Sequence, residues 1–370
     1  MKTQCVKITH MDTKTLGERI KLAREDLDFS QDQLAKRAGI DRTALTRIEK
    51  GERKVSAVEL VHLADILATP LAWFVRDPLP MIVSRRSDAG PAHKVTAVLD
   101  RHLELFAGDV ASLLDSGVVT AAAERPTWRT PQSHQEAETT AGQVRTHLGV
   151  GTDPMLGLPA FAERLGLFSC SLKLGELGAD GAMVAVTDRV AVAVIDGDTK
   201  IGRRRMSLTH ELGHWLFGDS FDSGVGDAER MINSFAAHLL APRAGISRIW
   251  HEHPAETVRD KAIRVASTFG MSWSAVIFHL RNLNFIDQDN YRTLDNRNPV
   301  IGEFAKLGLT LSTDELRPPS LSPGLTAAIV AAYIDRRMTG PRAVELLRHG
   351  LDEEDLPERR EETADDFASL

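Results

Sequence analysis

The stretch SLTHELGHWLFGD, Ser207 to Asp219, restricts the fold of this chain more than any other segment. If it is helical, His210 and His214 lie on one face, where two imidazole nitrogens can reach one metal ion. Glu211 is rotated by about 100° from His210, so its carboxylate can reach a metal-bound water instead of the metal. This spacing is typical of zinc metalloproteases, in which the glutamate is the general base. We therefore predict that the helix binds Zn²⁺ through the two histidines, with Glu211 as the catalytic residue.

A catalytic zinc needs a third protein ligand and one open position. The downstream candidates are Asp219, Asp222, Asp227, Glu229 and His238. If the segment DAERMINSFAAHLLAP is one helix ended by Pro242, His238 lies about 900° of rotation beyond Glu229, on the opposite face. Both side chains cannot then reach one metal. Spacing favours Glu229 as the third metal ligand and leaves His238 as the alternative, while Gly213 allows another helix to approach closely.

A second motif lies near the N-terminus, in SQDQLAKRAGIDRTALTRIEKGERK. Ser30 and Ser56 each begin a helical pattern, and Gln33 and Glu59 follow three residues later, which is the spacing of a capping box. Gly39 breaks the pattern between two short helices. This is the layout of a helix–turn–helix, whose second helix enters the major groove of DNA.

The predicted recognition helix runs from about Asp41 to Lys50. Between Lys36 and Lys54 the sequence has seven basic and three acidic residues, an excess of positive charge that suits the phosphate backbone. Arginine can pair with guanine, and threonine can contact a thymine methyl group. The predicted DNA contacts are Gln31, Arg42, Thr43, Thr46, Arg47, Lys50 and Arg53.

Domains with this layout usually bind palindromes as dimers, so we expect a homodimer on a double-stranded DNA operator. The amphipathic pattern from Ala92 to Leu114 is either the dimer contact or a cover for the chain's own apolar surface. Such helical units sometimes serve only to dock proteins, which is the alternative to DNA binding. The segment from Ala266 to Val276 repeats the spacing of the first motif without its arginines, and we interpret it as structural.

Both motifs resemble known families. The block Leu16 to Val75 resembles the lambda-repressor/Cro-like (XRE) domain. RMSLTHELGHWLFGD followed by ERMINSFAAHLLAP resembles the ImmA/IrrE family of bacterial metallopeptidases, over roughly Gln135 to Asp287. This resemblance implies that the glutamate opening the second block, here Glu229, is the third zinc ligand and that the substrate is a protein such as a repressor. Ile232 departs from the pattern, in which alanine is usual, and could widen the gap between the two metal-binding helices.

The predicted fold class is α+β and mostly α: a five-helix helix–turn–helix domain, a zincin-like metallopeptidase domain with a small sheet, and a C-terminal helical region. The runs LFSCSL, GAMVAVTD and RVAVAVID predict short strands, with a turn near Asp188 between the last two. The expected segments are an N-terminal tail at 1–12, the DNA-binding domain at 13–80, a helical linker at 81–133, the metallopeptidase domain at 134–290, a helical region at 291–350 and an acidic tail at 351–370.

Composition argues against several other classes of protein. No apolar run approaches the roughly 18 residues of a membrane helix, so we expect no membrane association. The N-terminus lacks the apolar core of a secretory signal, and two cysteines, Cys5 and Cys170, suit a reducing cytoplasm. The net charge of −7 resides formally in the last twenty residues, which hold nine acids and two bases. Global charge therefore does not decide whether the chain binds nucleic acid.

Three functions fit these features. The first is a DNA-bound regulator with a zinc endopeptidase that cleaves a protein such as a repressor. The second is a transcription factor whose zinc domain is a non-cleaving sensor or partner-binding module. The third is an antitoxin-like protein that acts by DNA binding and sequestration. We favour the first, because a sensor would not need Glu211.

Overall fold

A computed structural model describes residues 12–67, 69–75, 83–87, 93–122, 124–175, 179–218, 226–309 and 315–360. Several sequence predictions fall outside this part: the N-terminal tail up to residue 11 with Cys5, the candidate ligands Asp219 and Asp222, the side chain of Asp227, and the last ten residues of the acidic tail. Among the described residues, no helix combines the length and apolar character that crossing a bilayer requires.

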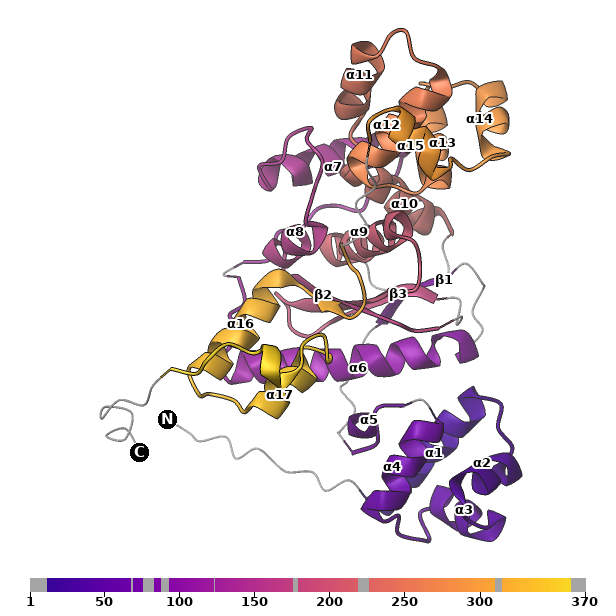
Figure 1. Ribbon diagram of the computed structural model, residues 1–370, viewed down its shortest axis with the longest axis vertical. Helices are drawn as coiled ribbons and strands as arrows, with labels where there is room; N and C mark the ends of the chain where they lie inside the picture. The colour runs from indigo at the N-terminus through magenta and orange to yellow at the C-terminus, as the bar shows by residue number, and fades with distance from the viewer. Residues whose placement is uncertain are drawn as a thin grey trace.

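Five described helices form the N-terminal unit, at the bottom of Figure 1. They are α1 (Thr13–Asp26), α2 (Gln31–Ala38), α3 (Arg42–Glu49), α4 (Ala57–Ile66) and α5 (Leu71–Val75). Both predicted capping boxes are present, at the starts of α2 and α4. Gly39 ends α2 with a φ of 67°, a left-handed conformation that glycine adopts without strain. The predicted helix–turn–helix is therefore confirmed as α2–turn–α3.

Within the described residues, five strands form one mixed sheet in the order β1-β3-β4-β2-β5. They are β1 (Val83–Ser87), β2 (Leu167–Leu172), β3 (Ala179–Ala185), β4 (Ala191–Asp196) and β5 (Ser320–Leu321). β2 and β4 pair in parallel, and the other pairs are antiparallel. The three predicted strands are confirmed, whereas the two edge strands were not predicted, because VSRRS is polar and β5 has only two residues.

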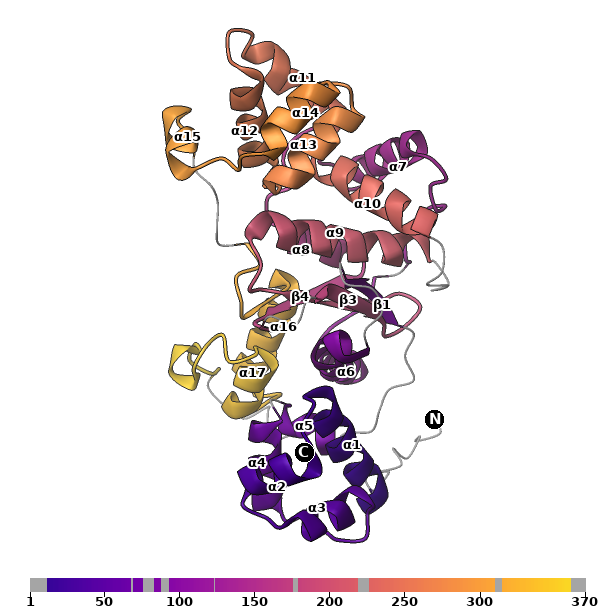
Figure 2. The same ribbon diagram turned by 90° about the vertical axis from the view of Figure 1, so that its right-hand side faces the viewer.

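Helices cover both faces of this sheet (Figures 1 and 2). On the upper side, α8 (Leu158–Arg164) and α9 (Ile201–Phe217) lie on the sheet, and α10 (Gly226–Leu240) and α7 (His134–His147) form a further layer above them. The lower face carries α6 (His93–Asp115), α16 (Pro323–Ile334) and α17 (Gly340–Leu346), followed by the 3₁₀ turn η1 (Glu353–Asp355). Alternate residues of β4 belong to two separate cores: Ala193 and Ile195 face the upper one, while Val192 and Val194 face the lower one.

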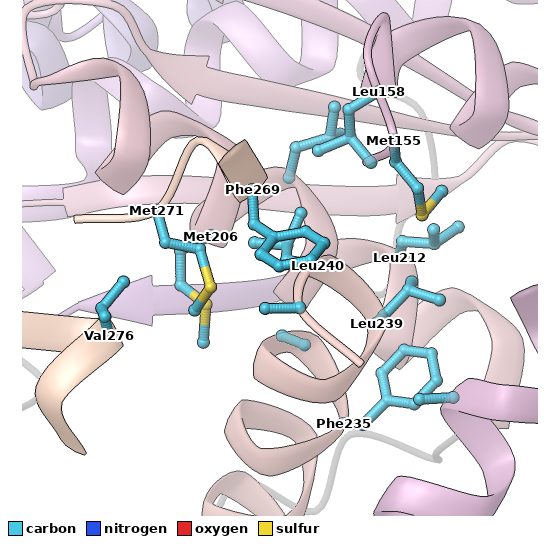
Figure 3. Close-up of a cluster of buried hydrophobic side chains, with 14 of the residues drawn as sticks. Met155, Leu158, Met206, Leu212, Phe235, Leu239, Leu240, Phe269, Met271 and Val276 are labelled. Carbon is cyan, nitrogen blue, oxygen red and sulfur yellow. The ribbon is translucent and has the colours of Figure 1, made fainter. Parts of the chain in front are cut away.

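A helical group lies at the end of the molecule opposite the helix–turn–helix unit (Figure 1). It consists of α11 (Arg243–Glu252), α12 (Val258–Phe269), α13 (Trp273–Asn282), α14 (Gln288–Asp295) and α15 (Ile301–Lys306). The second helix–turn–helix pattern is the α12–α13 pair, and its Ala266 and Val276 are buried in the upper core. Figure 3 shows how that core joins α8, α9, α10, α12 and α13 through side chains such as Leu212, Phe235 and Phe269.

The segment that we expected to be a helical linker, 81–133, is instead part of the sheet layer. It supplies β1, which pairs with β3, and α6, whose Leu103, Phe106 and Val110 pack in the lower core. We had considered two roles for this helix, a dimer contact and a cover for the chain's own apolar surface. The structure shows the second, because α6 packs on the lower face of the sheet. The reason is geometric: the sheet has two apolar faces, and only one is covered by the helices around α9.

The same helix also joins the sheet to the helix–turn–helix unit. Leu105 packs in the core of that unit, and Trp73 Nε1 donates a hydrogen bond of 2.7 Å to Glu104. Arg101 forms a buried ion pair with Asp26 and donates to Thr69 Oγ1 at 2.7 Å. α6 is therefore shared by two cores rather than being a flexible connector.

Two helical glycines give a matched test of this packing. A Cβ on Gly17 in α1 would collide with the carbonyl oxygen of Ile48 and lie 2.9 Å from that of Glu49, whereas one on Gly142 in α7 would meet nothing within 4 Å. We expect Gly17→Ala to destabilise the helix–turn–helix unit by about 1–3 kcal/mol through overpacking. Gly142→Ala should stabilise α7 by about 0.5–1 kcal/mol. Hydrogen exchange of the amides in α1, α3 and α7 measures both effects, and unchanged protection of α1 and α3 in Gly17→Ala would contradict the close contact.

Candidate metal centre and nucleic-acid interface

The helix α9 carries the HELGH motif through the interior of the chain. It lies between the sheet and α10, and His210 and Glu211 are completely buried. Gly213 faces α10 so closely that a Cβ there would lie 3.0 Å from Ile232 Cγ2 and 3.2 Å from Phe235 Cδ1. We had expected that Ile232 could widen the gap between the two helices, but the structure shows close contact there, because a methyl group of Ile232 fills the space that Gly213 leaves.

Three side chains converge where the two helices meet. His210 Nε2 and His214 Nε2 are 3.1 Å apart, and the two carboxylate oxygens of Glu229 lie 3.3 Å and 3.4 Å from these nitrogens. Two ligand atoms on a tetrahedral zinc, each about 2.1 Å from the ion, are about 3.4 Å apart. The separations and the N, N, O donor set therefore fit Zn²⁺. The structure brings Glu229 to the histidine pair, through a side chain that is 50% exposed.

Burial keeps His214 available as a metal ligand. Burial and the neighbouring His210 together lower the pKa of His214 to about 4, against the opposing effect of Glu229. His214 is thus neutral near pH 7, and a neutral imidazole offers a lone pair to a metal.

Asn233 supports His210 from behind. His210 Nδ1 lies 3.1 Å from Asn233 Oδ1, and a proton on Nδ1 donated to this oxygen leaves the lone pair on Nε2, facing Glu229. Sequence reasoning did not assign this role. The available signal was helical spacing, because Asn233 follows Glu229 by one turn on the same face of α10.

His238, the alternative third ligand, lies elsewhere. Its ring packs edge-on against His279 with centroids 4.7 Å apart, away from the group formed by His210, His214 and Glu229. His238 and Glu229 therefore lie on opposite faces of α10, as the helical spacing predicted.

The predicted DNA-contacting residues divide into two groups. Arg42, Thr43, Arg47 and Lys50 are exposed at α3, and Arg42 is only loosely paired with Asp32, at 3.6 Å. The remaining three make hydrogen bonds within the unit. The exposed group forms a basic surface along the helix that the sequence predicts to enter the major groove.

Gln31, Thr46 and Arg53 make hydrogen bonds inside the helix–turn–helix unit. Thr46 Oγ1 donates to Gln31 Oε1 at 3.0 Å, and Gln31 Nε2 donates to Glu49 Oε2 at 2.8 Å. Arg53 donates to Glu59 Oε1 at 2.7 Å. These three side chains hold α2, α3 and α4 in place, a role that sequence spacing did not predict.

Comparisons with known proteins identify both units. Residues 20–74 match a family model described as helix-turn-helix, and residues 178–281 match the Peptidase M78 family model, described as the IrrE N-terminal-like domain. The chain joins an XRE-type helix–turn–helix domain to an IrrE-like M78 domain. The M78 match contains the motif on α9, Glu229 and Asn233, so the candidate metal centre lies wholly within it.

Curated relatives resemble only a short part of the chain. A transcriptional regulator in the ATPase CF(0) region of Rhodospirillum rubrum is 33% identical over 70 residues, which is 19% of this chain and 64% of the relative. HTH-type transcriptional regulators of Sinorhizobium medicae and Rhizobium meliloti are each 36% identical over 62 residues, which is 17% of this chain and 45% of each relative. The chain thus covers less than two thirds of the length of each.

Solved structures give a weaker comparison. The apo competence regulator ComR of Streptococcus vestibularis is 11% identical over 90% of this chain and 89% of its own, with a TM-score of 0.17. ComR of S. thermophilus is 15% identical over 80% of this chain and 95% of its own, also with a TM-score of 0.17. At such scores the likeness carries no argument about fold or function.

The hydrogen bond to His210 can be tested through metal affinity. Asn233→Ala should weaken Zn²⁺ binding by about 10–100-fold, because the imidazole loses the partner that fixes its tautomer and orientation. Asn233→Asp keeps an acceptor and should retain most of the affinity. Competition with a chromophoric chelator measures both. The control is Ser234→Ala, which removes a 2.8 Å contact with the exposed His134. Equal affinities for Asn233→Ala and the control would rule out the supporting role.

Proposed function

We propose that this chain is a DNA-binding transcriptional regulator with a zinc-dependent endopeptidase that cleaves a protein such as a repressor. The observation that carries the peptidase proposal is the convergence of His210, His214 and Glu229 at separations of 3.1–3.4 Å, with Glu211 buried on the same helix. The match to the M78 family supports the same conclusion.

Each residue has a defined part in this mechanism. His210, His214 and Glu229 would hold the zinc ion, and Asn233 would orient His210. Zinc, when bound, supplies a Lewis acid that polarises the peptide carbonyl and makes water acidic. Glu211 takes the proton from the attacking water and passes it to the leaving amine, as a general base and then a general acid. The interior position of Glu211 excludes bulk water from that transfer.

The water-activation step gives a direct test. Glu211→Gln keeps the shape of the side chain but removes its basicity, so we expect unchanged zinc content and at least a 100-fold loss of cleavage. The assay incubates the purified protein with products of neighbouring genes, with and without a chelator, and follows fragments by mass spectrometry. Chelator-sensitive cleavage by the wild type is the positive control. Cleavage by Glu211→Gln at the wild-type rate would show that another residue is the base.

The helix–turn–helix domain would place this peptidase on an operator, as a homodimer. Support comes from the exposed Arg42, Thr43, Arg47 and Lys50 along α3 and from the match of residues 20–74. The domain's remaining polar contacts, such as Thr46 with Gln31, keep α3 fixed against α2 so that the exposed group is presented as one surface.

The DNA surface gives a second test. Arg42→Ala combined with Arg47→Ala should weaken binding to operator DNA, selected from a random pool, by at least 10-fold, because each lost base contact costs about 1–3 kcal/mol. The zinc content should not change. A matched double variant, Arg248→Ala with Arg292→Ala, removes two exposed arginines from the helical group far from α3. Fluorescence anisotropy at fixed salt compares them, and equal losses for the two doubles would contradict a recognition surface on α3.

One observation favours the second candidate, a regulator whose metal domain senses rather than cuts. α6 shares residues with both the helix–turn–helix core and the core below the sheet, so a change at the sheet has a packed route to the DNA-binding unit. Regulation that survives Glu211→Gln but requires zinc would support this candidate over cleavage.

A further inference from the structure

A large groove begins beside the candidate metal centre. It has a volume of about 1700 Å³ and is bounded by α7, the start of α9, α10 and α13. We call it the α10 groove and define it by Arg203, Met206, Asn233, His238, Trp273 and Phe278. Asn233 also contacts His210, at 3.1 Å, so the groove starts at the residue that supports a metal ligand. The metal-binding side chains themselves do not line the groove, so Asn233 is the residue at which the groove and the metal centre adjoin.

The floor of the groove is apolar. Met206, Met271, Trp273 and Phe304 line it and are buried; Figure 3 shows the two methionines close together between α9 and α13. At its edge Phe278 exposes 47% of its surface. Phe278 extends the apolar lining to the edge of the groove, and a contiguous apolar patch with polar residues around it is typical of a binding groove.

His238 is a buried polar residue in the lining of this groove. It is only 5% exposed, and within the described part of the chain its Nδ1 has no hydrogen-bond partner. His279, which packs against it, already uses Nε2 to donate to the carbonyl of Ala241 at 2.9 Å. Burial and the neighbouring His279 together lower the pKa of His238 to about 3, so the ring is neutral. His238 therefore contributes an uncharged ring to the lining, and its Nδ1 is too buried for an occupant of the groove to reach.

The charge around the groove is mainly positive. Its lining contains four basic side chains and two carboxylates: Lys200, Arg203, Arg230, Arg243, Glu138 and Asp198. Glu138 pairs with Arg243 through contacts of 2.7 Å and 2.9 Å, and Arg203 pairs with the buried Asp180 at 2.7 Å. Lys200 and Arg230 then stand against Asp198, and this excess of one positive charge favours an occupant with negative charge.

We propose that the α10 groove binds an extended peptide segment of the substrate in which acidic residues flank large apolar side chains, and thereby selects the protein to be cleaved. This inference rests on the proposed peptidase function. The volume of the α10 groove exceeds the roughly 300–1,000 Å³ of small-molecule pockets, and its lining combines apolar and basic side chains from several helices. An extended peptide can contact both, with its apolar side chains against the apolar lining and its carboxylates near the basic side chains.

The test measures binding without cleavage. Full-length protein carrying Glu211→Gln is titrated into a fluorescein-labelled peptide, Gly-Glu-Leu-Glu-Phe-Glu-Leu-Glu-Gly, and fluorescence anisotropy gives Kd. Two further peptides replace every Glu by Lys or every apolar residue by Ser. We expect the acidic apolar peptide to bind at least 10-fold more tightly than either, and equally well after a chelator removes zinc. No binding, or equal binding of the Lys peptide, overturns the proposal.

Matched variants locate the site. Phe278→Ser and Arg230→Glu should each weaken binding of the acidic apolar peptide at least 10-fold. The two control variants lie on the helix–turn–helix unit: Val61→Ser, at a residue that is 45% exposed, and Lys21→Glu. Each should change Kd less than 2-fold. Unchanged Kd in both groove variants overturns the proposal. Cleavage of a protein by the wild type without preference for such peptides contradicts the groove alone, whereas peptide binding without any cleavage contradicts the peptidase function alone.

Discussion

The close contact between α9 and α10 at Gly213 is the constraint on which the metal centre depends. His210 and His214 lie on α9 and Glu229 lies on α10, so the carboxylate reaches the two histidines only if the helix axes approach closely. A hydrogen atom at position 213 allows this, because any larger side chain would meet Ile232 Cγ2 at 3.0 Å and Phe235 at 3.2 Å. The contact is kept in place from both sides, since α9 packs on the sheet and α10 packs on α7. The HELGH motif on α9 therefore forms a three-ligand metal site only together with α10.

The second organising element is α6, which connects the DNA-binding unit to the sheet. Its inner side chains lie in the lower core, while Glu104, Leu105 and Arg101 bind the helix–turn–helix unit. The pair of Arg101 and Asp26 is buried, so a change that removes one partner would leave the other charge buried and unpaired, at a cost of about 3–5 kcal/mol. The two domains are thus joined by packed and charged contacts, and the orientation of α3 relative to the sheet is defined by them.

Local chemistry explains what the sequence could predict. Serine caps with Gln33 and Glu59, the turn at Gly39, and the helical repeat of His210 and His214 all depend on neighbours within a few residues, and the structure shows each of them. The edge strands β1 and β5 are defined by their partners in the sheet, not by their own composition. In the same way, Gln31 and Thr46 have the side chains of DNA contacts, yet they bond to each other across two helices. Such pairing between residues far apart in the sequence leaves no periodic pattern from which it could be predicted.

The two faces of α10 explain why one helix can serve both chemistry and selection. Glu229 and Asn233 face α9, and half a turn away Ser234 and His238 face α7 and α13. Because a helix is stiff, a movement imposed on one face by a bound chain is carried to the other face with little loss. Asn233 lies on both boundaries, since it lines the α10 groove and contacts His210. A peptide bound in the groove can therefore change the orientation of His210 directly through Asn233.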